Sequence, residues 1–143
     1  MTRVFVQKMD PSAKLPSYSH EGDAGMDLFS FEDAKLMPGE KILVSTGIKV
    51  AIPEGFAGFV WDKSGIATKN HIKTMAGVID SNYRGEIKIA LTNLGKEPYK
   101  IKKGAKVAQV IISPVASVNI TEVGDLEGDT ERGEKGFGSS GLI

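Results

Sequence analysis

The sequence predicts an all-β domain, and three observations support that prediction. Short apolar runs alternate with turn residues roughly every 8–12 positions, which is the spacing expected of a β-sandwich or barrel. Glycine makes up 17 of the 143 residues, about 12% against a usual share of about 7%, as many tight turns require. No segment repeats its apolar residues at the 3.6-residue period of an amphipathic helix.

Each predicted strand rests on its own segment. Residues 86–93 are the clearest, because Ile87, Ile89 and Leu91 recur at the two-residue period that puts them on one face. Further strands are expected at residues 4–6, 42–44, 47–52, 56–61, 99–102 and 105–112. Residues 64–70 leave room for at most one or two turns of helix. We expect Trp61, in an apolar run, to lie in the core.

The composition excludes several classes of function. Eighteen Lys and Arg residues balance eighteen Asp and Glu residues, so no bulk attraction to nucleic acid or to an anionic membrane is expected. The lack of cysteine excludes disulfides, thiolate catalysis and cysteine metal sites. No apolar run is long enough to span a bilayer, and no signal peptide is expected before the first strand. These features suit a cytoplasmic protein with neither nucleic acid nor membrane as its partner.

The chain divides into a body and a tail. Residues 1–123 contain all the predicted strands and have the length of one domain. Residues 124–143 are rich in glycine and acidic residues. Such a segment buries too little apolar surface to offset its ordering entropy, so we expect a flexible C-terminal arm.

Two short segments combine glycine with charged or hydroxyl side chains. In AGMDLFS, residues 24–30, Asp27 stands where a turn enters a strand; alone, this pattern favours a turn acid that caps its own backbone. In DKSGIA, residues 62–67, Lys63 and Ser64 supply a cation and a hydroxyl, and Gly65 lets backbone N–H groups face a phosphate. The alternative is that Ser64 caps a short helix.

The segment GVIDSNYRGE, residues 77–86, predicts a hairpin-like excursion bracketed by Gly77 and Gly85. Val78 and Ile79 are expected to be buried, which leaves Asp80 on a rigid backbone with an aromatic residue, Tyr83, three positions later. A carboxylate held in this way can orient a water molecule beside a sugar. The alternative is a hairpin acid that accepts hydrogen bonds from the N–H groups of its own turn.

A fourth segment, KVAQVI at residues 106–111, places Gln109 on the same face of a strand as Val107 and Ile111. A buried amide costs roughly 1–3 kcal/mol unless it finds hydrogen-bond partners. Gln109 therefore belongs either to a polar network or to a hydrated site.

The tail segment RGEKGFGSSG, residues 132–141, has an order of residues that a merely mobile tail does not need. Arg132 offers a bidentate phosphate donor, and Gly138 lets backbone amides close on an anion. Phe137 offers a ring that can stack on a base, and Ser139 and Ser140 add hydroxyl donors. We interpret this segment as a lid that closes over a nucleotide.

Taken together and in this order, the five segments resemble the five motifs of the trimeric dUTP pyrophosphatases (dUTPases), over residues 24–141. The segments at 77–85 and 132–141 are the most specific. The resemblance implies a distorted jelly-roll-like β-barrel that forms a homotrimer, with each active site gathering residues from three subunits. It also implies hydrolysis of dUTP to dUMP and pyrophosphate, which keeps dUTP out of DNA and supplies dUMP for dTMP synthesis.

The resemblance further implies a role for each motif residue. Asp80 would activate a water that attacks the α-phosphorus, and Tyr83 would pack on the deoxyribose and reject a 2′-hydroxyl. The hairpin backbone would read the edge of uracil and leave no room for a thymine methyl group. Asp27 would act through water on a Mg²⁺ that spans the triphosphate. The implied substrate-binding residues are Lys63, Ser64, Gly65, Gly77, Val78, Ile79, Tyr83, Gln109, Arg132, Phe137, Gly138, Ser139 and Ser140.

The sequence departs from the family pattern in the second motif, where Asp62 and Lys63 stand in place of Pro and Arg. Lys63 keeps the positive charge but lacks the planar fork of arginine. Two alternatives follow: a dCTP deaminase-like relative, which would need a Glu base in a differently built hairpin, and a non-catalytic nucleotide-sensing module. The presence of a candidate base, a phosphate clamp and a lid favours the hydrolase.

Overall fold

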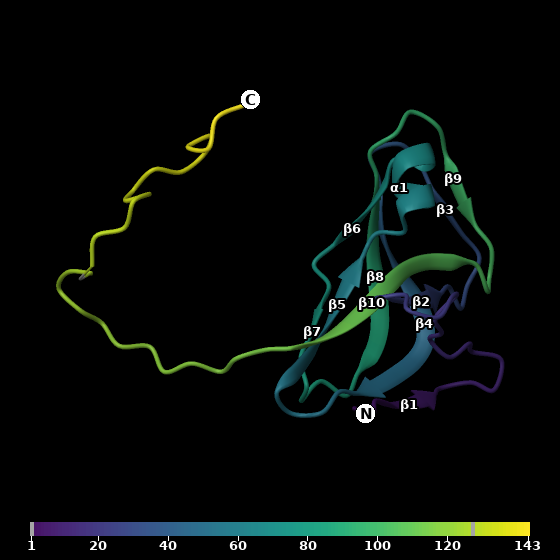
Figure 1. Cartoon of the computed structure of the whole chain (residues 1–143). Helices are drawn as coiled ribbons and strands as arrows, with labels where there is room; N and C mark the ends of the chain where they lie inside the picture. The colour runs from purple at the N-terminus through teal and green to yellow at the C-terminus, as the bar shows by residue number, and fades with distance from the viewer. Residues whose placement is uncertain (1, 127) are drawn as a thin grey trace.

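Antiparallel strands make up nearly all the regular structure of the chain (Figure 1). The computed structural model describes residues 2–126 and 128–143. One sheet has the order β1 (Phe5–Lys8), β4 (Lys41–Ala51), β8 (Glu86–Asn93) and β6 (Ile72–Met75). The second has the order β2 (Met26–Phe29), β10 (Lys106–Pro114), β5 (Phe56–Trp61) and β7 (Val78–Ile79). A two-stranded ribbon joins β3 (Ala34–Leu36) to β9 (Tyr99–Ile101).

The two four-stranded sheets form a distorted, jelly-roll-like barrel, which confirms the predicted all-β fold. Their inner faces make the core, where Ile87, Ile89 and Leu91 of β8 are all buried, as their period predicts. Ile89 pairs directly with Val44 of β4, and both side chains are fully enclosed. Burial of each such side chain is worth roughly 1.5–3 kcal/mol.

Two residues expected in the core lie on its outside. Trp61 is 55% exposed and Val78 is 65% exposed. The register explains both, because Trp61 pairs with Gln109 across β5 and β10, and Val78 pairs with Phe59 across β7 and β5. These pairs share the face of the second sheet that points away from the first sheet. The predictions of burial for Trp61 and Val78 were therefore wrong, whereas Ile79 is buried as expected.

The described residues contain one helix, α1 (Ser64–Asn70), within the one or two turns predicted. Lys63 is the N-cap residue and makes no side-chain capping bond, and Ser64 is already the first helical residue. The alternative of Ser64 as a helix cap is therefore wrong. Among the described residues, no helix is both long enough and apolar enough to cross a membrane.

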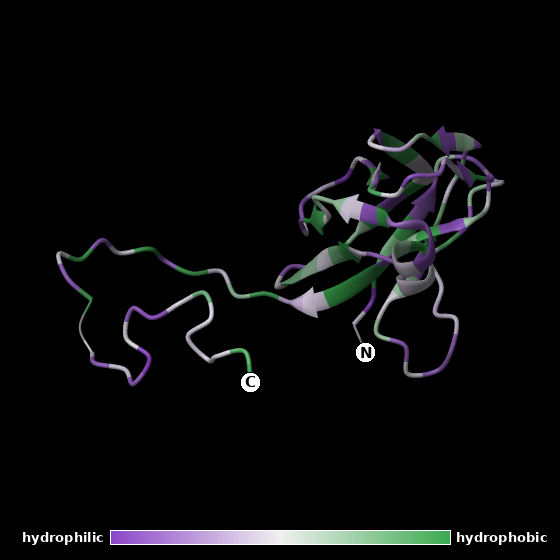
Figure 2. Ribbon diagram, turned by 90° about the horizontal axis from the view of Figure 1, so that it is seen from above, coloured by the Kyte–Doolittle hydropathy of each residue, from purple (hydrophilic) through white to green (hydrophobic). Residues whose placement is uncertain are grey.

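The chain leaves the body after β10. Val115 still donates its N–H to the carbonyl of Gly55, at 2.9 Å. The described residues beyond it form no helix or strand. Figures 1 and 2, two views at right angles, both show this segment running away from the barrel. The predicted arm, residues 124–143, is its distal part.

Candidate functional site

A cavity of about 580 Å³ opens beside the hairpin that contains β7. Five of the six residues that the sequence singled out in this hairpin line the cavity, all but Gly85: Gly77, Val78, Ile79, Asp80 and Tyr83. Its remaining walls are Val60, Ala76, Glu86, Ile87 and Lys88. The predicted hairpin residues therefore share one hollow of the right size for part of a nucleotide.

Gly77 is required by the geometry of the hairpin. Its φ is +106°, and a Cβ placed there would lie 2.9 Å from the carbonyl oxygen of Val60. The Gly77 carbonyl accepts a hydrogen bond from the Val60 N–H at 2.8 Å. This close backbone approach fixes the floor of the cavity, and only glycine permits it.

Asp80 lies at the rim of the cavity with an exposed side chain. Its backbone carbonyl accepts the Tyr83 N–H at 3.1 Å, which closes a turn. Within the described residues, the side-chain oxygens of Asp80 accept no hydrogen bond from the protein. The alternative of a turn acid that caps its own hairpin is therefore wrong, and both oxygens face a place that water can reach.

Tyr83 is held by contacts to the start of β8. Its hydroxyl donates to the carbonyl of Glu86 at 2.9 Å. The Glu86 carboxylate in turn accepts the Gly47 N–H at 3.0 Å and the Ser45 hydroxyl, which anchors it to an irregularity in β4. A Cβ on Gly85 would lie 2.3 Å from the Tyr83 hydroxyl oxygen. The missing side chain of Gly85 therefore leaves the space that the Tyr83 ring occupies.

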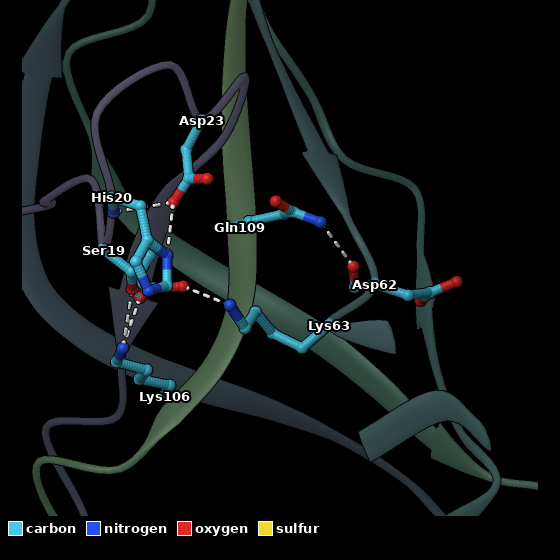
Figure 3. A network of polar contacts seen from close by, with 8 residues as sticks. Ser19, His20, Asp23, Asp62, Lys63, Lys106 and Gln109 are labelled. Carbon is cyan, nitrogen blue, oxygen red and sulfur yellow. Dashed lines mark hydrogen bonds and ion pairs between the residues drawn. The ribbon is translucent and has the colours of Figure 1, made fainter. Parts of the chain in front are cut away.

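A second group of polar residues surrounds Asp27, and we call Asp27, Ser19, Lys63 and Lys106 the Asp27 cluster (Figure 3). Lys63 Nζ lies 2.6 Å from Asp27 Oδ1, and Lys106 Nζ lies 2.7 Å from Oδ2. The Ser19 hydroxyl donates to Oδ2 at 2.6 Å. Asp27 does not cap its own backbone, so the turn-acid interpretation is wrong.

The Asp27 carboxylate is ionised over a wide pH range. Only 2% of the residue is exposed, and burial alone would raise its pKa. Hydrogen bonds from Lys106, Lys63 and Ser19 outweigh burial and lower the pKa from 3.8 to about 2. At neutral pH the cluster therefore holds one carboxylate between two ammonium groups.

Gln109 lies next to this cluster, because it pairs directly with Asp27 across β10 and β2. Its amide nitrogen donates to the Asp62 carbonyl at 2.8 Å, so it belongs to a polar network, one of the two expected arrangements (Figure 3). A Cβ on Gly25 would lie 2.3 Å from the Gln109 side-chain oxygen. Gly25 therefore makes room for the amide.

The Asp62 carboxylate, at a position where this sequence departs from the family pattern, is bound by other residues of the same chain. One oxygen accepts the backbone N–H and the hydroxyl of Thr74, at 2.6 and 2.7 Å, and the other pairs with Lys73 at 2.7 Å. Burial raises the pKa of Asp62, but its bonds to Lys73 and Thr74 lower it further and the net shift is downward. Its carboxylate is thus tied to β6.

Ser64 and Gly65 follow Lys63 directly and are both exposed. A Cβ on Gly65 would meet no atom within 4 Å, and its φ is not positive. Neither the backbone conformation nor the packing of this chain requires glycine at position 65. Its absent side chain leaves the start of α1 open to close approach by a ligand.

Within a single chain, the hairpin and the Asp27 cluster lie far apart. Ile79 pairs with Gly58, so Asp80 lies beside the beginning of β5, whereas Lys63 follows the end of β5. A six-residue strand spans about 20 Å. The structure therefore brings the predicted residues together as two separate groups.

The arm residues contact neither group. Arg132 donates from Nε to the Lys135 carbonyl at 2.7 Å, and Phe137 is fully exposed with a φ of +29°. Gly138, Ser139 and Ser140 are exposed as well. No hydrogen bond or ion pair among the described residues joins positions 124–143 to the barrel. The segment that the sequence predicts as a lid therefore lies away from both groups in this chain.

Sequence reasoning missed four polar residues of these two groups. Glu86 and Lys88 alternate with the buried residues of β8, and that alternation could have assigned them to the outer wall beside the hairpin. Lys106 opens the fourth motif, three positions before Gln109. Ser19 carried no signal, because its contact with Asp27 depends on how a loop folds back.

The arrangement of acidic and histidine side chains argues against a metal held by the protein alone. The described residues contain no group of three or more His, Asp or Glu side chains that could hold a metal ion. The Asp27 carboxylate has an ammonium group on each oxygen, which repels a divalent cation.

Comparisons with known proteins agree with this geometry. The family model described as dUTPase matches residues 11–141. The deoxyuridine 5′-triphosphate nucleotidohydrolase of Clostridium kluyveri is 49% identical over 98% of this chain and 99% of its own length. The enzyme of the same name from Alkaliphilus metalliredigens is 47% identical over 99% of each chain.

Solved structures give the same result. The dUTPase of Staphylococcus bacteriophage 80alpha with dUPNHPP has a TM-score of 0.94 and 32% identity, covering 99% of this chain and 100% of that one. A mutant dUTPase from phage phi11 of S. aureus, described for its coordination of a structural Mg(II) ion, has a TM-score of 0.82 and 28% identity, covering 88% and 99%. By its sequence, its fold and its relatives, the chain belongs to the dUTPase family.

Proposed function

We propose that this chain hydrolyses dUTP to dUMP and pyrophosphate, with Asp80 activating the attacking water. The observation that carries the proposal is the position of Asp80, whose oxygens accept no bond from the described protein atoms at the rim of the hairpin cavity. A general base needs a free oxygen within hydrogen-bond reach of a water. The names of the relatives support dUTP as the substrate.

The hairpin cavity is the proposed site for the nucleoside. The backbone of Gly77, Val78 and Ile79 has fixed N–H and C=O groups that can read one edge of uracil. Tyr83, whose hydroxyl is bonded to the carbonyl of Glu86, would pack on the deoxyribose and exclude a 2′-hydroxyl. Rigid support of both parts favours selection for size as well as for hydrogen bonding.

The exposed groups near the Asp27 cluster are the proposed site for the phosphates. Lys63 supplies positive charge, Ser64 a hydroxyl and Gln109 an amide, and Gly65 leaves room for an oxygen to approach. Phosphoryl transfer depends mostly on positioning and on neutralising charge. These residues offer both without forming a covalent bond.

We propose that a homotrimer completes the site, since the hairpin and the phosphate groups of one chain lie about 20 Å apart. The hairpin of one copy would face the Asp27 cluster of another. The outer face of the second sheet, with Trp61 and Val78 exposed and Phe59 and Ile111 half-buried, offers an apolar surface for this contact.

The arm, residues 124–143, would close the site from a neighbouring copy. Arg132, Ser139 and Ser140 would bind the distal phosphates, Gly138 would let the backbone approach them, and Phe137 would cover the base. The open position of these residues in the single chain fits an arm that closes only on a bound nucleotide. We expect the reaction in the cytoplasm, where nucleoside triphosphates are found.

Mg²⁺ is the proposed cofactor, and we propose that the triphosphate brings it. Asp27 would contact the hydrated ion only through water, at the acceptor position of Oδ1 that Lys63 leaves free, while both lysines stay on the carboxylate. When bound, the ion would neutralise charge on the phosphate oxygens.

Release of pyrophosphate from dUTP, measured beside dTTP, dCTP and UTP, tests this proposal. We expect hydrolysis of dUTP and little of the other three. Ammonia release from dCTP would indicate the deaminase alternative. Binding of dUTP without hydrolysis of any of the four nucleotides would indicate a sensing module.

A further inference from the structure

Two lysines share one buried carboxylate at the proposed phosphate site. Asp27 is 2% exposed and lies on β2, whereas Lys63 follows β5 and Lys106 begins β10. The two ammonium groups bind opposite oxygens of the same carboxylate, at 2.6 and 2.7 Å. Three separate elements thus converge on one anion. Figure 3 labels the two lysines, Lys63 and Lys106.

The Asp27 cluster has an excess positive charge that solvent can reach. Two ammonium groups and one carboxylate leave a net charge of about +1 at neutral pH. The Lys63 and Lys106 side chains are 28% and 48% exposed, whereas the Asp27 side chain is 3% exposed. An ammonium has three donors; Lys63 uses one on Asp27, and Lys106 uses two, on Asp27 and Ser19. Donors therefore remain for a second anion.

The Asp27 carboxylate also reduces the electrostatic repulsion between the two lysines and limits their movement. Two ammonium groups this close repel each other, and each long side chain loses rotamer freedom when it is fixed. Asp27 offsets the repulsion and fixes both groups beside Gln109, its direct partner across the sheet. Gly25 leaves the space in which the amide of Gln109 sits.

We propose that Lys106 is a second phosphate-binding residue beside Lys63, and that Asp27 is the positioning residue that holds both ammonium groups for the polyphosphate chain. The inference rests on the proposed function and assigns a residue to it. Two point charges on one carboxylate supply two phosphate donors, which a single planar guanidinium would supply alone.

Binding of a non-hydrolysable dUTP analogue and of dUMP, measured by calorimetry, tests the role of Lys106. Lys106→Gln should weaken binding of the triphosphate analogue by about ten- to hundredfold, since one charge-assisted hydrogen bond is lost. Binding of dUMP should change much less, and Lys106→Arg should restore most of the analogue affinity. Lys100→Gln, on the exposed side of β9, is the matched control and should bind both ligands as the unmodified chain does.

A double-mutant cycle tests the positioning role of Asp27. If Asp27 acts through the lysines, the effects of Asp27→Asn and Lys106→Gln on analogue affinity should be far from additive. A purely structural role for Asp27 predicts additive effects, with equal losses for dUMP and the analogue. Thermal unfolding of each variant shows whether the fold is intact.

The outcomes separate this inference from the proposed function. Equal analogue affinity in the unmodified chain and in Lys106→Gln would overturn the inference and leave dUTP hydrolysis intact. Equal loss of dUMP and of the analogue would overturn it too. Failure of the unmodified chain to bind the analogue at all would instead reject the proposed function.

Discussion

The Asp80 carboxylate is the group on which the proposed chemistry depends. We predict that Asp80→Asn lowers turnover by about 10²–10⁴-fold, because the amide cannot accept a proton from water. Binding of a non-hydrolysable dUTP analogue should be retained, since the shape of the cavity does not change. Steady-state pyrophosphate release and calorimetry measure the two effects. Glu21→Gln, at an exposed acid away from the cavity, is the control, and near-normal turnover of Asp80→Asn would remove Asp80 from its role.

Gly85 allows us to displace Tyr83 without changing Tyr83 itself. In Gly85→Ala the new methyl group would lie 2.3 Å from the Tyr83 hydroxyl oxygen, so the ring must move. We predict that the preference for dUTP over UTP, measured as the ratio of kcat/KM, falls by about tenfold or more. Gly124→Ala, where an added Cβ meets nothing within 4 Å, is the control. An unchanged ratio would show that Tyr83 does not select the sugar.

Asp27 makes the free energy of unfolding depend on pH in the acid range. Because its pKa falls from 3.8 to about 2 on folding, its contribution to stability is complete above pH 3.8 and is lost as the pH falls toward 2. The free energy of unfolding should decrease by about 2 kcal/mol more in the unmodified chain than in Asp27→Asn over this window. Urea unfolding at several pH values measures the difference. Parallel curves for the two proteins would contradict the pairing.

At the scale of elements, β8 shows how far the sequence predicts the fold. Its two-residue period identifies both the strand and its buried face, because one face of an antiparallel sheet packs on the core. Trp61 and Val78 were wrongly predicted to be buried, because no such period marks the buried face of their strands. Which face of β5 and β7 points outward depends on their pairing with β10 and with each other, and hydrophobicity alone does not reveal it.

The candidate site was predictable where its residues are close in sequence. Gly77, Asp80 and Tyr83 lie within one hairpin, so their common cavity follows from a short segment. Asp27 and Lys106 meet only because β2 pairs with β10 across most of the chain length. Long-range strand pairing of this kind is not encoded in any local pattern, which is why the contact of Lys106 with Asp27 was found only in the structure.

The arm is an element whose removal should separate activity from folding. A chain ending at Glu131 should keep a melting temperature within about 3 °C of the full chain, because the lost residues are exposed. Its kcat/KM for dUTP should fall by about a hundredfold or more, since the lid no longer positions the phosphates. Calorimetric unfolding, light scattering and pyrophosphate release measure the three properties. Loss of the trimer on truncation would show that the arm is part of the assembly and not a lid.

At the scale of the whole molecule, the barrel carries the two proposed half-sites, the hairpin and the Asp27 cluster, on one rigid scaffold. Asp80 lies near the beginning of β5 and Lys63 beyond its end, so the six-residue strand keeps them apart. Neither half-site can bend toward the other without breaking the pairing of β5 with β7 and β10. The proposed rotationally symmetric trimer would bring each half-site to the complementary half of another copy.

Mixing two inactive variants tests the shared site most directly. One carries Asp80→Asn in the hairpin, and the other carries Lys63→Gln with Ser64→Ala at the phosphate groups. If each site takes its hairpin and its phosphate residues from different copies, random mixed trimers should restore about one quarter of the sites. Pyrophosphate release from dUTP after co-refolding should therefore rise well above that of either variant alone. No recovery in trimers shown to contain both variants would contradict the shared site.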